Sequence, residues 1–237
     1  MSDGGRAKRA KARGRPRERG AAKERSSRPQ ARVAAASASG DRRRGASGVA
    51  RRTGGRGRDE HLIETMVSSE PVFDGKLLHV RRDTVRLPDG KLATREHIVH
   101  PGAVLIVPVL PDGRFVVERQ YRYPLDRVII EFPAGKLDPG EAELDTARRE
   151  LREEAGYDAT TWTFLGTIHT IVSYTNEKVD FFVAEGLSHV GAKLDDGEFL
   201  EIVTMSLDEM LAALDRGEIT DAKTVAALLL YARRRAR

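Results

Sequence analysis

The sequence predicts a domain that mixes strands and helices, of the α/β or α+β class, behind a separate N-terminal tail. Two strand-like pairs, each joined by a Pro-Asp-Gly turn, come early in the body of the chain, and three helical stretches follow. Strands and helices interleave without the regular spacing of repeated strand-helix-strand units, so the pattern alone leaves both classes open.

The tail differs from the body in composition and charge. The first 58 residues hold 19 of the 41 Lys and Arg residues but only 4 of the 36 Asp and Glu residues, so the tail carries +15 and the remainder −10. With almost no large apolar side chains, the tail cannot bury enough surface to offset the entropy of ordering. We expect a disordered basic tail over residues 1–61 and one globular domain over residues 62–237, of which residues 62–100 form N-terminal strands.

The tail also carries a weak nucleic-acid signal. Residues 11–16, Lys-Ala-Arg-Gly-Arg-Pro, resemble an AT-hook core, whose arginines enter the narrow minor groove of A·T-rich DNA. Arg/Gly/Pro-rich composition produces such strings readily, so the favoured alternative is an inert tail or one that binds nucleic acid weakly through phosphates. A translation start near Met66, which would omit the tail, is a third possibility.

The cysteine content and the hydropathy of the chain limit the cellular compartments in which it can work. The chain has no cysteine, which excludes disulfides, thiolate metal sites and cysteine nucleophiles. Its longest apolar stretch, residues 103–110, is interrupted by Pro108 and is far shorter than the ~20 residues that span a bilayer. No apolar signal segment follows the N-terminus, so we expect a cytoplasmic protein without membrane contact.

The first elements of the body are two predicted hairpins. Residues 77–87 and 91–99 have strand-like composition around a Pro-Asp-Gly turn, in which Pro fixes φ and Gly can adopt positive φ. Residues 103–110 and 114–121 flank a second Pro-Asp-Gly turn and predict a second hairpin.

The later elements are helices and single strands. Ser206 with Glu209 three residues on predicts a capped helix start. Helices are expected at residues 141–155, 207–214 and 221–235, and further strands at residues 163–171, 179–184 and 199–205.

The first helix carries a dense set of carboxylates. Glu150, Glu153 and Glu154 are spaced i, i+3 and i+4, so they project from one face within reach of a common ion. Oxygen ligands without His or Cys favour Mg²⁺ or Mn²⁺ over zinc, and Mg²⁺ usually recruits substrate phosphates. The alternative is a solvated face whose acids pair with neighbouring Arg side chains.

The spacing of polar residues around this helix resembles the signature of the Nudix hydrolases, the Nudix box. Only the last position departs from it, where Tyr157 replaces an aliphatic residue. The resemblance implies the Nudix fold, an α/β/α sandwich around a mixed sheet, and metal-dependent cleavage of a nucleoside diphosphate derivative. The matching positions are Gly135, Glu141, Arg149, Glu150, Glu153, Glu154 and Gly156.

The carboxylates and the resemblance together suggest roles for the box residues. Glu150 and Glu154 are the expected metal ligands, with Glu153 bridging the metal or acting beside it in catalysis. A metal there would neutralise phosphate charge and lower the pKa of a bound water. The resemblance adds the backbone carbonyl of Ala134 as a ligand.

Three further box residues have supporting roles. Arg149 and Glu141 are expected to orient the carboxylates, a catalytic contribution without metal ligation. Gly135 lies in the loop before the helix, beside the expected substrate, and Gly156 is expected to end the helix.

Segments outside the box resemble the ADP-ribose pyrophosphatase branch of the family. These segments are residues 119–122, 131–136 and 221–224, and the resemblance covers residues 65–235. It implies hydrolysis of ADP-ribose to AMP and ribose 5-phosphate. It also implies that Arg122, or secondarily Arg119, contacts the substrate, the alternative being exposed strand arginines.

Loop residues complete the site that the resemblance implies. Glu177 matches a loop glutamate that faces the substrate. A further acid that serves as metal ligand or base is expected at Glu198, or alternatively Asp196, unless this stretch is an ordinary acidic turn. The branch is typically homodimeric with exchanged N-terminal hairpins, and Arg95 lies where a cross-subunit contact with the substrate would arise.

One departure bears on the substrate. Members specific for ADP-ribose commonly carry a Ser-Pro-Gly run after the box, whereas this chain has Val172 at the proline position. GDP-mannose, other nucleoside diphosphate sugars and dinucleotides therefore stay as alternatives. A Nudix-fold binding protein without catalysis is the alternative class, although such proteins usually lose box acids that this chain keeps.

Overall fold

The computed structural model describes residues 59–194, 197 and 199–237. Of the predicted tail, only residues 59–61 are described: Asp59 precedes a short 3₁₀ turn (η1, Glu60–Leu62) that includes the other two. The rest of the tail, with its AT-hook-like segment, lies outside the described residues. The same is true of Asp196 and Glu198.

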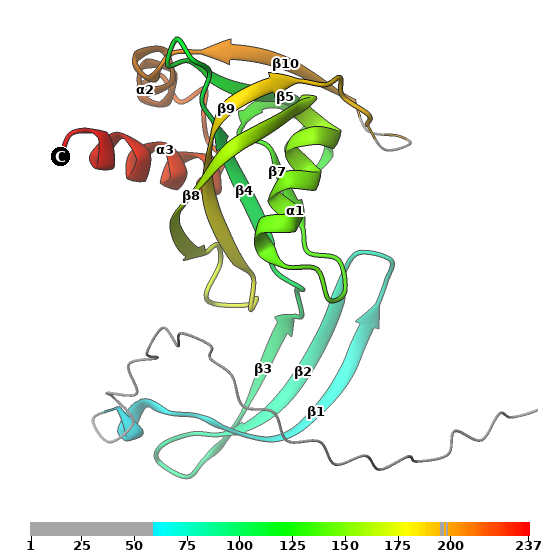
Figure 1. Ribbon diagram of the computed structural model, residues 1–237. Coiled ribbons are helices and arrows are strands. Elements are labelled where there is room, and N and C mark those ends of the chain that lie inside the picture. The colour runs from blue at the N-terminus through cyan, green and yellow to red at the C-terminus, as the bar shows by residue number, and fades with distance from the viewer. Residues whose placement is uncertain (1–58, 195–196, 198) are drawn as a thin grey trace, which may run out of the picture. The chain divides into compact units, whose positions relative to one another are not determined.

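The chain then forms a three-stranded antiparallel sheet in the order β1-β2-β3 (Figure 1). The strands are β1 (Thr65–Asp74), β2 (His79–Arg86) and β3 (Leu92–Ile98). The turn between β2 and β3 closes with Gly90 at φ 86°, a conformation that glycine adopts without steric cost, which confirms the first predicted hairpin.

A second, four-stranded sheet forms the centre of the structure. Its order is β7-β4-β9-β8, in which β4 and β9 run parallel and the other pairs antiparallel, so the sheet is mixed. Every residue of β4 is buried, as expected for a short apolar run covered on both faces. The strands are β7 (Ala134–Lys136), β4 (Ala103–Pro108), β9 (Lys178–His189) and β8 (Tyr157–His169).

The remaining strands form a third sheet, and here the second predicted hairpin is wrong. The expected turn is present, with Leu110 N–H donating to the Arg114 carbonyl at 2.8 Å, but a single bridge joins the strands beyond it. Both edges of β4 are already occupied by β7 and β9, so the strand after the turn pairs elsewhere. The resulting antiparallel order is β10-β5-β6, with β10 (Leu200–Met205), β5 (Phe115–Arg122) and β6 (Arg127–Glu131).

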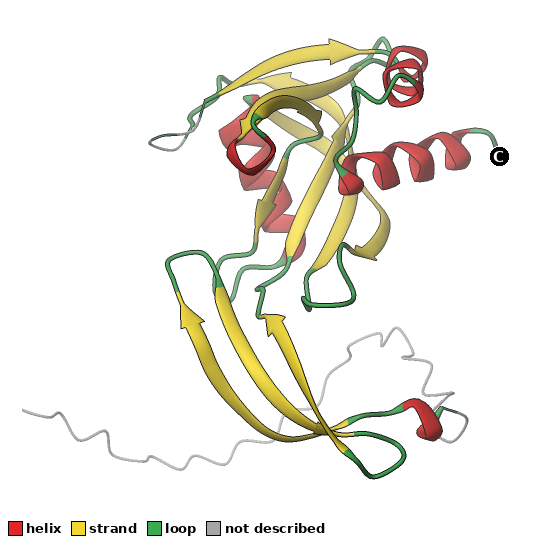
Figure 2. Cartoon of the chain, turned by 180° about the vertical axis from the view of Figure 1, so that it is seen from behind, coloured by secondary structure: helices red, strands yellow, loops and turns green. Residues whose placement is uncertain are grey.

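Helices cover both faces of the central sheet, which confirms the α/β/α sandwich (Figures 1 and 2). On one face lies α1 (Glu143–Glu150), continued by a π-helical turn (η3, Leu151–Ala155). On the other lie α2 (Leu207–Asp215) and α3 (Ala222–Arg235). No helix in the described part of the chain is long and apolar enough to cross a membrane.

Helix α2 begins at the predicted residue, and α3 begins one residue after the predicted start. The Ser206 hydroxyl accepts the Glu209 N–H at 3.2 Å and the Glu209 carboxylate accepts the Ser206 N–H at 2.7 Å, which completes the capping box. Asp221 caps α3 by accepting the Thr224 N–H at 2.9 Å.

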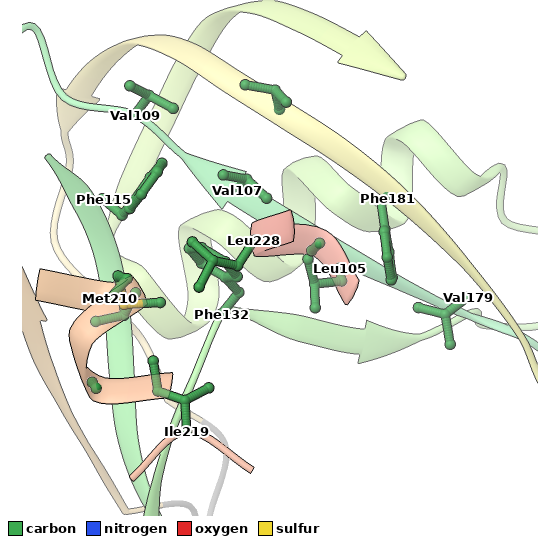
Figure 3. Close-up of a cluster of buried hydrophobic side chains, with 14 of the residues drawn as sticks. Leu105, Val107, Val109, Phe115, Phe132, Val179, Phe181, Met210, Ile219 and Leu228 are labelled. Carbon is green, nitrogen blue, oxygen red and sulfur yellow. The ribbon is translucent and has the colours of Figure 1, made fainter. Parts of the chain in front are cut away.

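The larger core lies between the central sheet and α3 (Figure 3). The ring of Phe115 packs edge-on against Phe132 at 5.5 Å and against Tyr231 at 5.0 Å, so α3 is held against strand β5 by aromatic contacts. The smaller core lies under α1, where Ala147 and Leu151 pack against Val104 and Ile106 of β4. Because α1 is fixed on this rigid strand, its polar face has a defined position.

Candidate active site

The box residues converge on one small pocket. The pocket has a volume of about 220 Å³ and lies between β7 and the helical segment formed by α1 and η3. Strand β7 contributes backbone and the helical segment contributes carboxylates. The lining residues are Ala134, Gly135, Lys136, Arg149, Glu150, Glu153 and Glu154.

Glu154 is fixed to the β7 side of the pocket. Its Oε2 accepts the backbone N–H of Ala134 at 3.1 Å, and the residue is only 8% exposed. Glu154 projects from the π-helical turn, a feature that is rare in helices and frequent at functional sites. Gly156 ends this turn at φ 75°, and a Cβ there would lie 2.6 Å from the Ala192 nitrogen, so only glycine fits.

Gly135 makes room for the carboxylate of Glu150. A Cβ at position 135 would lie 1.8 Å from Glu150 Oε1 and 1.9 Å from its Cδ. Glu150 is 9% exposed, so its carboxylate is packed directly against the β7 backbone. Any larger residue at position 135 must therefore displace a predicted metal ligand.

Arg149 connects the remaining acids. Its Nε and Nη2 donate to the two carboxylate oxygens of Glu141 at 3.1 and 3.0 Å, a bidentate pair. Its Nη1 donates to Glu150 at 2.8 Å and to Glu153 at 3.0 Å. The Arg149 guanidinium lowers the pKa of Glu141 to about 2, and the Glu141 carboxylate in turn raises the pKa of Arg149. This geometry suits residues that orient the carboxylates.

The donor set of the pocket fits a hard divalent cation. Among the described residues, no three acidic or His side chains are arranged closely enough to hold a metal as the structure stands, and Arg149 serves as counter-ion to Glu150 and Glu153. Nevertheless, three carboxylates and the backbone of Ala134 share one pocket, and Glu150 and Glu154 are about nine-tenths buried. Buried carboxylates this close are stabilised by added positive charge, and oxygen donors are the set that Mg²⁺ prefers.

Beside the pocket, Arg122 is held by a buried ion-pair network that the sequence reasoning missed. Glu131, 2% exposed, accepts from Arg122 Nε at 2.6 Å and Nη2 at 3.0 Å, and from Lys223 Nζ at 2.7 Å. Partial burial lowers the pKa of Arg122, but nearby carboxylates raise it by more, so the net pKa is raised. The strongest of these is Glu131, followed by Asp221 and Glu154. Arg122 therefore lies within electrostatic reach of Glu154.

A sequence signal for this network was available. Glu131 interrupts the apolar run Val-Ile-Ile-Glu-Phe at residues 128–132, and a charge inside a buried strand must be paired. Its partners could not be named from sequence, because Lys223 lies 92 residues away on α3.

The other predicted site residues make contacts outside the pocket lining. Arg119 pairs with Glu201 across β5 and β10, and Arg95 pairs with Glu64 beside the N-terminal sheet. The Glu177 carboxylate accepts the Thr170 hydroxyl and lies 3.5 Å from His100 Nε2. None of these three side chains lines the pocket that the described box residues form, and Asp196 and Glu198 lie outside the described residues.

Comparison with known proteins agrees with this geometry. The model of the NUDIX domain family matches residues 99–228, and that of the nucleoside diphosphate sugar hydrolase N-terminal domain matches residues 64–98. The chain is 40% identical over 169 residues to the ADP-ribose pyrophosphatase of Bacillus subtilis, covering 70% of this chain and 91% of that protein. It is 38% identical over 167 residues to the methanol dehydrogenase activator of Bacillus methanolicus, covering 70% and 90%.

A solved structure of an ADP compounds hydrolase is similar in fold, with a TM-score of 0.65 and 29% identity over 72% of this chain and 92% of that one. The family model covers more than half of the chain, and the relatives are matched over nearly their whole length. The pocket, the fold and these matches coincide on the same residues: the chain belongs to the Nudix family of hydrolases, which cleave diphosphate bonds.

Proposed function

We propose that the chain is a Mg²⁺-dependent diphosphohydrolase that cleaves ADP-ribose to AMP and ribose 5-phosphate, with Mn²⁺ as the alternative cation. The observation that carries this proposal is the pocket in which Glu150, Glu153 and Glu154 converge on the backbone of Ala134. The names of the relatives support the choice of an ADP-linked substrate.

The residues around the pocket divide the chemistry among them. Glu150, Glu154 and the carbonyl of Ala134 would hold the cation, with Glu153 beside them. When bound, the cation supplies charge neutralisation for the diphosphate and a lowered pKa for a water nucleophile. Arg149, tied to Glu141, keeps Glu150 and Glu153 oriented before a substrate arrives.

Arg122 is the side chain best placed to bind the diphosphate. Glu131 engages its Nε and Nη2, which leaves the Nη1 edge of the guanidinium for a phosphate oxygen, and the side chain is 42% exposed. Arg119 stays the second choice. The proposal includes two further roles. Glu177 faces the substrate, and Glu198 or Asp196 serves as a base or a further metal ligand.

A substrate panel tests the proposed activity. With Mg²⁺ present, we expect kcat/KM for ADP-ribose to exceed that for GDP-mannose and for a dinucleotide, and EDTA to abolish all three activities. Release of AMP and ribose 5-phosphate identifies the cleaved bond. A higher kcat/KM for GDP-mannose would favour the alternative substrate. That alternative stays open because Val172, 83% exposed, stands where ADP-ribose-specific members have proline. Binding without any cleavage would favour the non-catalytic class.

Replacing Arg122 by Ala should lower kcat/KM for ADP-ribose by roughly 10- to 100-fold, the value of one or two charged hydrogen bonds to the diphosphate. Steady-state kinetics measure this effect, and Lys223→Met should cause a smaller loss by loosening the Glu131 network. Arg127→Ala is the matched control, because Arg127 lies opposite Arg122 on β6 and donates to Thr220 instead. If Arg122→Ala and Arg127→Ala had equal effects, Arg122 would be an exposed strand arginine that does not contact the substrate.

We also propose that the enzyme is a homodimer in which the N-terminal sheet is covered by the partner. This sheet exposes many large apolar side chains, which favours burial in an interface. Sedimentation of the full chain should give a dimer, and Arg95→Ala should raise KM if Arg95 reaches the partner's substrate. A monomer with full activity would refute this arrangement. The exposed side chains are Met66, Val67, Val72, Phe73, Leu77, Leu78 and Leu92.

The location and the tail stay as predictions. We propose a cytoplasmic location, because a chain without cysteine fits a reducing compartment. We propose that the +15 tail binds nucleic acid weakly through phosphates, without altering hydrolysis. DNA binding across a salt series, compared between the full chain and a version beginning at Arg58, tests this. Equal binding by both would exclude the tail as the contact.

A further inference from the structure

A second hollow lies on the face of the central sheet opposite the box. Its volume is about 570 Å³, within the range of small-molecule sites. It is bounded by the turn between β4 and β5, by the edge of β8 and β9, and by the last turns of α3. Helices α3 and α1 cover opposite faces of the sheet (Figure 1). The hollow shares no lining residue with the box pocket.

Two arginines at the end of α3 supply positive charge to this hollow. Arg234 and Arg235 both line the hollow, and neither takes part in the ion pairs found among the described residues, whereas the box arginine Arg149 pairs with three carboxylates. Arg234 Nη1 donates to the Phe164 carbonyl at 3.2 Å, which fixes the guanidinium and leaves its other N–H groups available. Arg235 bonds to the Tyr231 hydroxyl, which holds the second guanidinium beside the same cavity. The two positive charges together suit a phosphate or carboxylate group.

The rest of the lining suits an aromatic body that carries polar groups. Val109, Leu110, Pro111 and Val183 form an apolar wall. The ring of Tyr231 completes it, held in place by its edge-on contact with Phe115, and burial raises the pKa of the Tyr231 hydroxyl above its ordinary value.

Polar groups lie on the sheet side of the same hollow. The carboxylate of Glu185 and the hydroxyl of Thr163 can accept hydrogen bonds from ribose hydroxyls or a ring amine. A phosphate-binding end, an apolar and aromatic wall and acceptors for hydroxyl groups are the three features of a nucleotide site.

We propose that this hollow is a second ligand site, separate from the box, that binds a nucleoside monophosphate. Arg234 and Arg235 take the phosphate, the apolar wall and Tyr231 take the base, and Glu185 takes the ribose. The inference does not depend on which diphosphate the box cleaves, because it concerns binding of a compound that has no diphosphate bond.

Equilibrium binding of AMP to the full chain in EDTA tests the site. Without a divalent cation, the box carboxylates repel a phosphate, so the remaining binding reports the hollow. We expect saturable binding at one AMP per chain, and weaker binding of adenosine and of inorganic phosphate, because each lacks one half of the ligand. The double variant Arg234→Gln/Arg235→Gln should weaken AMP binding by about 10-fold or more.

Two matched variants make the result decisive. Arg233 lies in the same helical turn but does not line the hollow, so Arg233→Gln should change affinity by less than about twofold. Arg122→Ala, on the box side, should leave AMP binding in EDTA unchanged. Absence of saturable binding, an equal loss in Arg233→Gln, or a loss in Arg122→Ala without one in the double variant would each overturn the proposal.

Discussion

Replacing Glu154 by Gln should keep the fold and lower kcat by ~10² or more, the cost of removing a specific charge contact in the transition state. Gln has the same shape as Glu, and its side-chain oxygen can still accept the Ala134 N–H, so the change removes a charge without opening a cavity. Turnover of ADP-ribose, affinity for Mg²⁺ and circular dichroism should be measured on the same preparations.

We expect the same change to stabilise the apo protein slightly. Like charges spaced i,i+4 on a helix cost about 0.2 to 0.5 kcal/mol per pair, and Glu150 and Glu154 are such a pair. Glu143→Gln is the control, since Glu143 lies on the same helix but pairs with Lys178 outside the pocket. Full turnover by Glu154→Gln, or an equal loss in Glu143→Gln, would remove Glu154 from the metal site.

Replacing Gly135 by Ala should lower kcat/KM by roughly 10- to 100-fold, as expected when a metal ligand is displaced by a neighbour rather than removed. The new methyl group would meet the carboxylate of Glu150 at 1.8 Å. Because that carboxylate ends a flexible side chain, it can move while the backbone stays in place, so the loss of activity should exceed the loss of stability. Kinetics and Mg²⁺ titration, each beside thermal unfolding, separate the two effects.

Gly140→Ala provides the opposite control. Gly140 has φ 84° and open space around the position of a Cβ, so alanine there should cost about 1 to 2 kcal/mol of stability through backbone strain and leave the pocket intact. Unchanged kinetics in Gly135→Ala would show that Glu150 does not need its observed position.

Local chemistry explains which parts of the structure could be predicted from sequence. The turn at Gly90 and the Ser206 capping box each depend on residues within four positions of one another, so their geometry follows from the sequence directly. The same holds for the box, since Arg149, Glu150, Glu153 and Glu154 share one helical segment. The Nudix fold followed from this spacing by resemblance.

The features that were mispredicted or missed depend on distant parts of the chain. Strands β4 and β5 separate into two sheets because β9, some 70 residues later, occupies the edge of β4 that a hairpin would need. Strand β7 has the sequence Ala-Gly-Lys, which carries no strand preference, and it exists only because it pairs with the other edge of β4.

The sequence by itself determined the composition of the active site, namely which acids could share a metal and which arginine could orient them. Only the tertiary structure decided how those acids are held. The fixed positions come from backbone and side chains that meet through packing: Ala134 against Glu154, Gly135 against Glu150, and Lys223 with Arg122 on Glu131. Residue type and spacing are encoded locally, whereas the contacts of a buried charge depend on which distant element covers it.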